Sequence, residues 1–268
     1  MKTPLLLTLA LSLAALSASA NLVQPLGSSH QILVPAAGSV AGANNTFFRS
    51  EITILNYRNA DQEVQLLWLP QGGTPPTPRK LTINARSGIA SADFVAEVVG
   101  QTGLGSLVIT GVFTNTDTAD NAARLYVTSR IYTAQPGTSG FVSQTFSTIP
   151  AQTINFTRLA MVGIRRDAQY RLNVGVINVD STRAQTLQIT LGNSLGGTEV
   201  ITVLVQPLSM QQVSFPGPPF ANPQILVENI TPLATRSTRW TTYASSIDNV
   251  TGDSWSVVGF ERPDVAAP

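Results

Sequence analysis

Few residues in this chain have the chemistry that catalysis or metal binding usually requires. The sequence of 268 residues contains one histidine, His30, and no cysteine. A Ser-His-Asp arrangement would have to use His30, which follows Gly27-Ser28-Ser29 in a segment typical of a flexible lead-in. The lack of cysteine excludes disulfides, thiol nucleophiles and thiolate metal sites. We therefore predict a protein that is not an enzyme, with no catalytic residue, no metal ligand and no cofactor.

Carboxylates are the remaining candidates for catalysis, because glycoside hydrolysis needs only a pair of suitably spaced Asp or Glu side chains. The acidic residues are scattered, and Glu51 and Glu228 fall within strand patterns. Most of the others lie in expected turns, as do Asp61, Asp117, Asp120, Asp180, Asp248 and Asp253. A carboxylate-dependent hydrolase is therefore the lowest-ranked of three functional hypotheses.

Two acidic loops, 115–121 and 248–253, carry oxygen ligands that calcium accepts. Neither loop has the pattern of an EF-hand, and both lie where hairpin turns are expected. Turn formation is the main interpretation, and calcium binding by these loops stays an open alternative.

Aromatic side chains raise the question of carbohydrate binding, because exposed rings stack on sugars. The candidate ligand-binding residues are Trp240, Tyr243 and Trp255, which lie in the last expected hairpin. Trp240 aligns with Arg124 of the first half rather than with an aliphatic residue, so its exposure stays open. Trp68 alternates with Val64 and Leu66, which predicts that it packs in the core.

An internal repeat organises the elements that must position these side chains. The segment from Phe48 to Asn56 matches the segment from Tyr170 to Asn178, at a spacing of 122 residues, in its aromatic, Arg, aliphatic and Asn positions. Aliphatic residues alternate with a period of two in both copies, which indicates strands with one buried face. Each strand ends in an Asn, which favours a turn in which the Asn side chain bonds nearby backbone.

The same reasoning predicts strands along the whole chain and almost no helix. A single short helix is expected from Asp93 to Val99, ended by Gly100. The strands are expected at 31–35, 48–56, 63–69, 79–84, 88–92, 105–112 and 122–133 in the first half, with a further apolar stretch at 141–149, and at 155–163, 170–178, 185–191, 198–206, 210–215, 224–230, 237–247 and 254–260 in the second. This number of strands suits an all-β fold of two tandem homologous antiparallel β-sandwich domains of the immunoglobulin-like kind.

In these repeated features the chain resembles the tandem immunoglobulin-like β-sandwich repeat proteins that bacteria secrete or display. The resemblance rests on the aromatic-Arg start, the alternating strand ending in Asn and the second aliphatic strand. It implies architecture only, because such modules serve as spacers, adhesins and accessory domains and most are of unknown function.

The first residues have the features of an export signal. Lys2 precedes an apolar run from Leu5 to Leu16, and Ala18-Ser19-Ala20 ends it, so we expect a signal peptide at 1–20. Domains are then expected at 21–150 and 151–268. The mature chain would have no transmembrane segment and would be secreted or periplasmic. Loss of Lys2 leaves fifteen basic and fifteen acidic residues, which argues against nucleic acid as a partner.

The leading hypothesis is an exported, non-catalytic structural or interaction module at the bacterial envelope or outside the cell. Its expected partners are an envelope protein or a polysaccharide. The alternative is a carbohydrate-binding module that uses the aromatic residues of the second repeat. Self-association through edge strands is a further expectation, because few Lys residues are available to blunt those edges.

Overall fold

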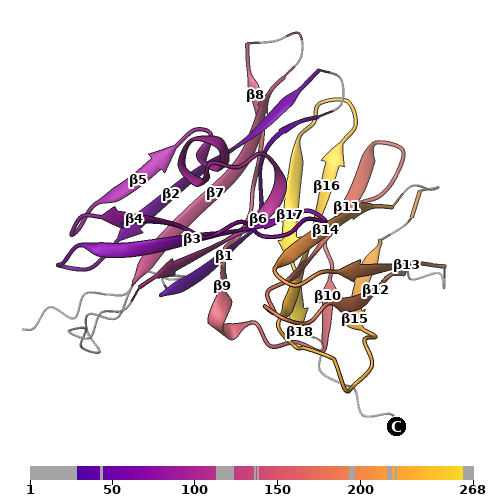
Figure 1. The fold of residues 1–268 in the computed structure, drawn as a ribbon. Helices are drawn as coiled ribbons and strands as arrows, with labels where there is room; N and C mark the ends of the chain where they lie inside the picture. Colours follow the sequence, from indigo (N-terminus) through magenta and orange to yellow (C-terminus); the bar gives the residue numbers. More distant parts are fainter. Residues whose placement is uncertain are drawn as a thin grey trace, which may run out of the picture.

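The computed structural model is built almost entirely of antiparallel β-strands (Figure 1). It describes residues 29–42, 45–112, 124–135, 137, 139–192, 197–215, 219–220 and 222–261. The expected all-β fold class is confirmed. The signal peptide expected at 1–20 lies outside the described residues, as does the acidic loop at 115–121.

Strands of the first half follow the expected positions closely. They are β1 (Gln31–Ala41), β2 (Phe47–Asn56), β3 (Gln62–Pro70), β4 (Arg79–Ile83), β5 (Gly88–Ser91), β6 (Gly103–Gly111), β7 (Leu125–Ala134), β8 (Phe141–Thr145) and the short β9 (Ile149–Pro150). The main difference is β1, which continues past the expected end at residue 35. Its pairing with β6 shifts register between Val34 and Ala37, which marks a β-bulge. The bulge accommodates Pro35, which has no backbone N–H to donate.

Strands of the second half also lie where the alternating pattern predicts them. They are β10 (Arg158–Met161), β11 (Tyr170–Asn178), β12 (Gln185–Gly192), β13 (Thr198–Val205), β14 (Ser209–Ser214), β15 (Gln224–Asn229), β16 (Trp240–Asp248), β17 (Ser254–Val258) and the short β18 (Phe260–Glu261). Between the halves, a 3-10 turn at Ala151–Thr153 connects β9 to β10.

The order of strand pairing in the first half recurs in the second. In the first half the layers are β4-β3-β6-β1 and β5-β2-β7-β8, and in the second they are β13-β12-β15-β10 and β14-β11-β16-β17. One difference is that residues 39–41 of β1 also pair with β2, which joins the first-half layers into one continuous sheet. The second-half layers are separate sheets.

Each half has its own apolar core between its two layers. In the first, Ile52 and Ile54 of β2 face Leu66 and Trp68 of β3, so the expected packing of Trp68 is confirmed. In the second, β11 and β12 contribute the corresponding aliphatic residues, Leu172, Val174, Val176, Leu187, Ile189 and Leu191. The period-two pattern therefore identified the inward faces correctly.

Asn56 and Asn178 end equivalent strands and make equivalent hydrogen bonds. The Oδ1 atom of Asn56 accepts the backbone N–H of Arg58, and the Oδ1 atom of Asn178 accepts that of Asp180. Each Nδ2 group also donates to three backbone carbonyls: those of Ala60, Ile83 and Asn84 in the first half, and of Arg183, Val205 and Gln206 in the second. The expected turn role is confirmed, and each Asn additionally fixes the end of the neighbouring edge strand.

Helical structure in the described residues consists of short turns. A π-helical turn at Val95–Val99 ends at Gly100, whose φ of 76° is left-handed, close to the expected helix at 93–99. Within the part of the chain that the structure describes, no helix has the length and apolar character needed to cross a bilayer.

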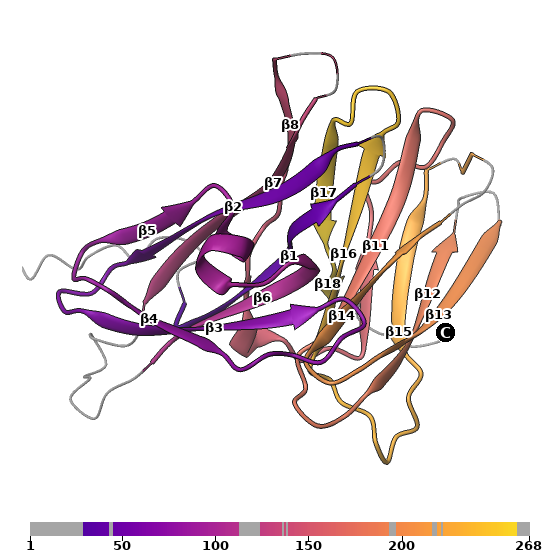
Figure 2. The ribbon, with the colours of Figure 1, turned by 45° about the horizontal axis from the view of Figure 1, so that its top comes forward.

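The two halves are joined by a third apolar cluster, which lies outside both sandwich cores. Leu33 of β1 and Val108 of β6 pack with Ile177 of β11, Met210 of β14 and Tyr243 of β16. These side chains project from the outward faces of their strands, opposite to the core residues. Figure 2 shows the β6 and β14 layers side by side. The outer face of one sheet in each half is therefore buried by the other half.

Candidate functional site

The three aromatic candidates are separated in the structure, and two of them are buried. Trp240 and Tyr243 each have 0% relative exposure, so neither has the exposed ring that the carbohydrate-binding hypothesis requires. Trp240 lies in the core of the second half, since its side of β16 faces the opposite sheet. Tyr243 lies on the outward side of β16, but the first half covers it there. Neither ring presents a face for stacking on a sugar.

Tyr243 is held by polar as well as apolar contacts. Its Oη donates to Gln212 Oε1 at 2.8 Å, and its ring meets Phe146 edge to face, with centroids 5.3 Å apart. Complete burial raises the pKa of its phenol, because the phenolate would lose its hydration. These contacts give Tyr243 a structural role between the halves.

Trp255 is half-buried on β17. Its Nε1 donates to the carbonyl of Gly163 at 2.8 Å, and its ring meets Tyr170 edge to face at 5.3 Å. A ligand role for Trp255 stays a prediction. Trp240 and Tyr243 are buried, so they do not form a row of exposed rings with it.

The described carboxylates act mainly as partners of arginines and of turns. Glu51 pairs with Arg130, and Glu228 with Arg158. Burial disfavours ionisation of Asp167, but hydrogen bonds from Arg165 and from the backbone of residues 169 and 170 hold its pKa below the ordinary value. Every carboxyl shift resolved in the described residues is downward. A general acid needs the opposite shift, so the hydrolase hypothesis gains no support.

The acidic loop at 248–253 forms a tight turn. Asp248 Oδ1 accepts the backbone N–H groups of Val250 and Thr251, at 2.7 Å and 2.8 Å. Those bonds, and one from Gln169, lower the pKa of Asp248. Among the described residues no group of three His, Cys, Asp or Glu side chains gathers as metal ligands would. Calcium binding here stays untested, while the turn role has direct structural support.

His30 lies next to an ordered pairing rather than in a free lead-in. Ser29 bridges to Leu125, and the carbonyl of His30 accepts the backbone N–H of Gly111 at 2.8 Å. Residues 29 and 30 are therefore tied to β7 and β6.

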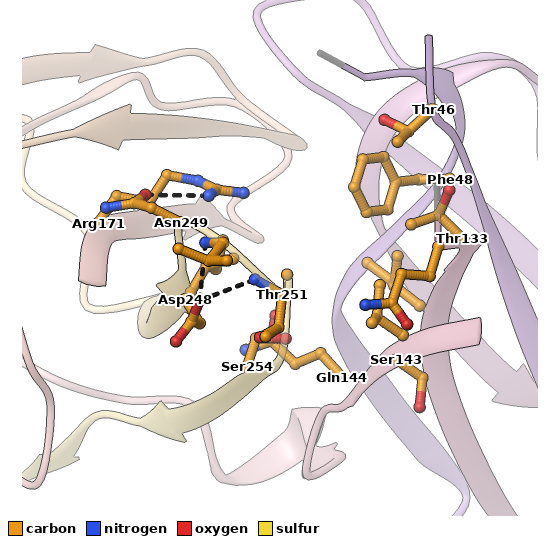
Figure 3. Close-up of a pocket in the computed structure, with 16 residues that line it drawn as sticks. Thr46, Phe48, Thr133, Ser143, Gln144, Arg171, Asp248, Asn249, Thr251 and Ser254 are labelled. Atoms are coloured by element: carbon orange, nitrogen blue, oxygen red, sulfur yellow. Dashed lines mark hydrogen bonds between the residues drawn. The ribbon is translucent and has the colours of Figure 1, made fainter. Parts of the chain in front are cut away.

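A cleft of about 590 Å³ lies between the two halves. One wall comes from the start of β2 and from the β7–β8 hairpin, and the other from Arg171 of β11 and the β16–β17 hairpin. Figure 3 shows Thr46, Phe48 and Thr133 on one side, facing Arg171, Asp248 and Asn249 on the other. Its volume lies within the range typical of ligand pockets.

The cleft is lined by both neutral polar and apolar residues. The neutral polar ones are Thr46, Thr133, Gln135, Ser143, Gln144, Asn249, Thr251 and Ser254, and the apolar ones are Phe48, Ile131, Val142, Ile247 and Val250. Its charged residues are Arg171 and Asp248, which are opposite in sign. Desolvation lowers the pKa of the Arg171 guanidinium, whereas attraction to Asp248 opposes that shift. Arg171 Nη1 also donates to Asn249 Oδ1 at 3.2 Å.

Gln144 is the one buried side chain of this lining with an unused amide donor. It is 8% exposed, and its Nε2 atom has no hydrogen-bond partner within the described structure. That atom is itself enclosed by protein, with less than 1 Å² of its surface exposed, so a molecule in the cleft does not reach it. Sequence reasoning missed this site because its residues come from segments far apart in the chain, and each segment alone has an ordinary hairpin pattern.

Comparison with known proteins adds little to this description. No protein-family model matches the chain, and no curated protein matches it. A solved structure described as "Crystal Structure of Thermotoga maritima 1070" is 12% identical, with a TM-score of 0.33 over 40% of this chain and 96% of that chain. A likeness at this level does not establish a shared fold, so the cleft is interpreted from its own residues.

Proposed function

We propose that this chain is an exported, non-catalytic interaction module of the bacterial envelope or extracellular space. It consists of two homologous immunoglobulin-like sandwiches, in residues 21–150 and 151–268. The recurring order of strand pairing and the equivalent bonds of Asn56 and Asn178 support a duplicated domain. The signal pattern at 1–20 supports export.

The observation that carries this proposal is the third apolar cluster. Leu33, Ile177, Met210 and Tyr243 are fully buried between the halves, which fixes how the two sandwiches sit against each other. Because the two sandwiches keep one position relative to each other, the walls of the cleft stay at a constant separation. Walls that are preorganised in this way favour binding. The cleft supplies hydrogen-bonding groups, while the nearby acid Asp248 is engaged in its turn.

Edge strands offer a separate route to association. Among the strands that the structure describes, β13 pairs only with β12, and it leaves Val200 and Leu204 more than half exposed, so self-association through this edge stays a prediction. Sedimentation over a wide concentration range would test it.

The proposed function is tested by immobilising residues 21–268 and measuring retention of purified envelope fractions: envelope protein, peptidoglycan, lipopolysaccharide and secreted polysaccharide. We expect one fraction to be retained and then eluted with unchanged composition. The variant Ser143→Trp fills the cleft and should abolish retention, whereas Thr128→Trp, on an exposed position of β7, should not. Retention of none of the fractions, or steady release of new reducing ends or free amines, would contradict a non-catalytic envelope module.

A further inference from the structure

We infer that strand β13 pairs with β13 of a second copy of this chain, antiparallel and about a two-fold axis at Thr202. The inference rests on the edge-strand association of the proposed function and gives it one partner and one register. No described strand lies beyond β13, which ends its sheet on the side of the second half that faces away from the first half (Figure 2). The cleft lies between the two halves, so this pairing leaves it open.

The neighbouring strand β12 shows which way the main-chain groups of β13 point. Thr186 of β12 uses both of its main-chain groups on the side of β15: its carbonyl accepts the N–H of Ile230 at 3.0 Å, and its N–H donates to Thr231 Oγ1 at 2.7 Å. In an antiparallel ladder each residue directs its N–H and C=O to one side, and the sides alternate along the strand. Leu204 lies opposite Thr186, so this pair exchanges no main-chain hydrogen bonds, and the N–H and C=O of Leu204 point away from β12.

Three residues of β13 therefore present both main chain and side chain to solvent. Val200 and Thr202 have the same parity as Leu204, so their N–H and C=O groups also point to the free edge. Their side chains lie on the outward face of the sheet, where all three are exposed. A strand edge with free main-chain groups and exposed aliphatic side chains is a template for pairing with a further strand.

The corresponding edge of the first half, β4, carries the residues that prevent such pairing. Lys80 lies opposite Gln65, as Thr202 lies opposite Gln188, so Lys80 and Thr202 hold corresponding positions. Two residues before Lys80 is Pro78, which has no N–H to offer a further strand. Lysine and proline are the residues that natural proteins place on strand edges to block association, and β13 contains neither. Only the edge of the second half is therefore left open to a partner.

The strand is complementary to itself in the proposed register. Thr202 lies opposite its own copy, and Val200 lies opposite Leu204 of the second copy on the same face, so aliphatic side chains pack across the axis on both sides. The free main-chain groups of these residues would form about six hydrogen bonds. The one charged residue of β13, Glu199, is held by both Nη atoms of Arg166 at 2.6 Å, and in this register it faces an aliphatic residue rather than a like charge. A two-fold axis uses the edge of each copy completely, so the assembly closes as a dimer.

Sedimentation velocity of residues 21–268 over a wide concentration range tests the association. We expect a dimer to form as the concentration rises. Thr202→Lys gives this edge the residue of the first-half edge and sets two ammonium groups opposite each other, so it should weaken dimerisation at least about tenfold. Thr128→Lys, at an exposed position of β7, adds the same charge elsewhere and should dimerise as the unmodified protein does. Both side chains are exposed, so the far-ultraviolet circular dichroism of the two variants should be unchanged.

Single cysteines test the register, because the unmodified chain contains no cysteine. Directly opposite residues of an antiparallel pair lie within disulfide reach, so Thr202→Cys should form a linked dimer on oxidation by air with a copper catalyst. Val200→Cys alone should not, because residue 200 of the second copy lies about 13 Å along the strand from the opposite position. A mixture of Val200→Cys and Leu204→Cys should form the link. Thr82→Cys, on the edge strand β4, is the matched control and should cross-link much more slowly than Thr202→Cys.

The possible results separate this inference from the proposed function. A monomer at every concentration, a dimer that Thr202→Lys leaves unchanged, or Thr82→Cys cross-linking as fast as Thr202→Cys would each overturn the β13 pairing. The Thr202→Lys monomer keeps the cleft, so it should still retain the envelope fraction that Ser143→Trp loses. A dimer that follows these expectations while no envelope fraction is retained would support the β13 pairing and contradict the proposed function.

Discussion

The ring of Tyr243 lies directly on the backbone of Gly175, its cross-strand partner in the pairing of β16 with β11. A Cβ atom at residue 175 would fall well inside van der Waals contact with the ring atoms Cε1 and Cζ of Tyr243. Glycine at this point lets the ring lie flat between the sandwiches, where it packs against Phe146. The pair therefore sets how closely the two halves approach.

Gly175→Ala should destabilise the protein by about 1–3 kcal/mol, because the added methyl group must displace a ring that is packed on all sides. Denaturant unfolding followed by tryptophan fluorescence measures the loss. Gly192→Ala is the matched control, since no atom lies within 4 Å of the Cβ position there. Equal midpoints for the two variants would show that the ring does not rest on Gly175.

Asn178→Asp should cost about 3 kcal/mol of folding free energy. The substitution keeps the acceptor for Asp180 but replaces the Nδ2 donor by a carboxylate oxygen facing three backbone carbonyls, which are then left without that donor. Urea unfolding gives the change in free energy. Asn173→Asp is the control, because Asn173 only accepts from Ser214 Oγ and a carboxylate can do the same, so its change should stay within about 0.5 kcal/mol.

Trp240→Ala should lower stability by about 3–5 kcal/mol, because it leaves a large cavity in the second core. Trp255→Ala should cost about 1 kcal/mol, since that ring is only half-buried and loses one hydrogen bond. Thermal unfolding of both variants checks the difference in burial. A cost for Trp240→Ala no greater than that for Trp255→Ala would contradict the core position of Trp240.

Glu199 should make stability depend on pH. Arg166, 3% exposed, donates from both Nη atoms to the Glu199 carboxylate at 2.6 Å, and this pairing holds the pKa of Glu199 below its ordinary 4.5. Because the pKa of Glu199 is lower in the folded state than in the unfolded state, the ion pair stabilises the fold at pH values above the ordinary pKa. This stabilisation is lost as the pH falls through the pKa of the folded state.

The measurement is urea unfolding of Glu199→Gln and the unmodified protein between pH 7 and pH 2. The variant should be less stable than the unmodified protein at pH 7, and the difference between their free energies of unfolding should narrow below about pH 4.5. Glu63→Gln serves as the control, because its partner Lys80 is largely exposed and that ion pair should contribute little. If the difference in free energy of unfolding stayed the same at acid pH, ionisation of Glu199 would not be what holds Arg166.

The strands, their inward faces and the turns that end them could be predicted from the order of residues alone. Period-two alternation reports contacts that are local to one sandwich, which is why the positions of Trp68 and of the β2 and β11 core residues could be predicted. The Asn turns could be predicted for the same reason, since residues close in the chain form part of each turn.

Which outward faces are covered depends on how the two halves pack together, and this could not be predicted from the residue pattern. Alternation places Tyr243 away from the core of its own sandwich, and the first half then buries it. A partial signal was present in the runs Ile32-Leu33-Val34 and Leu107-Val108-Ile109, because consecutive apolar residues indicate a strand buried on both faces. The pattern does not say what covers the second face. The cleft arises from that same docking, since its walls belong to different halves, and the spacing between them depends on long-range packing that no local pattern encodes.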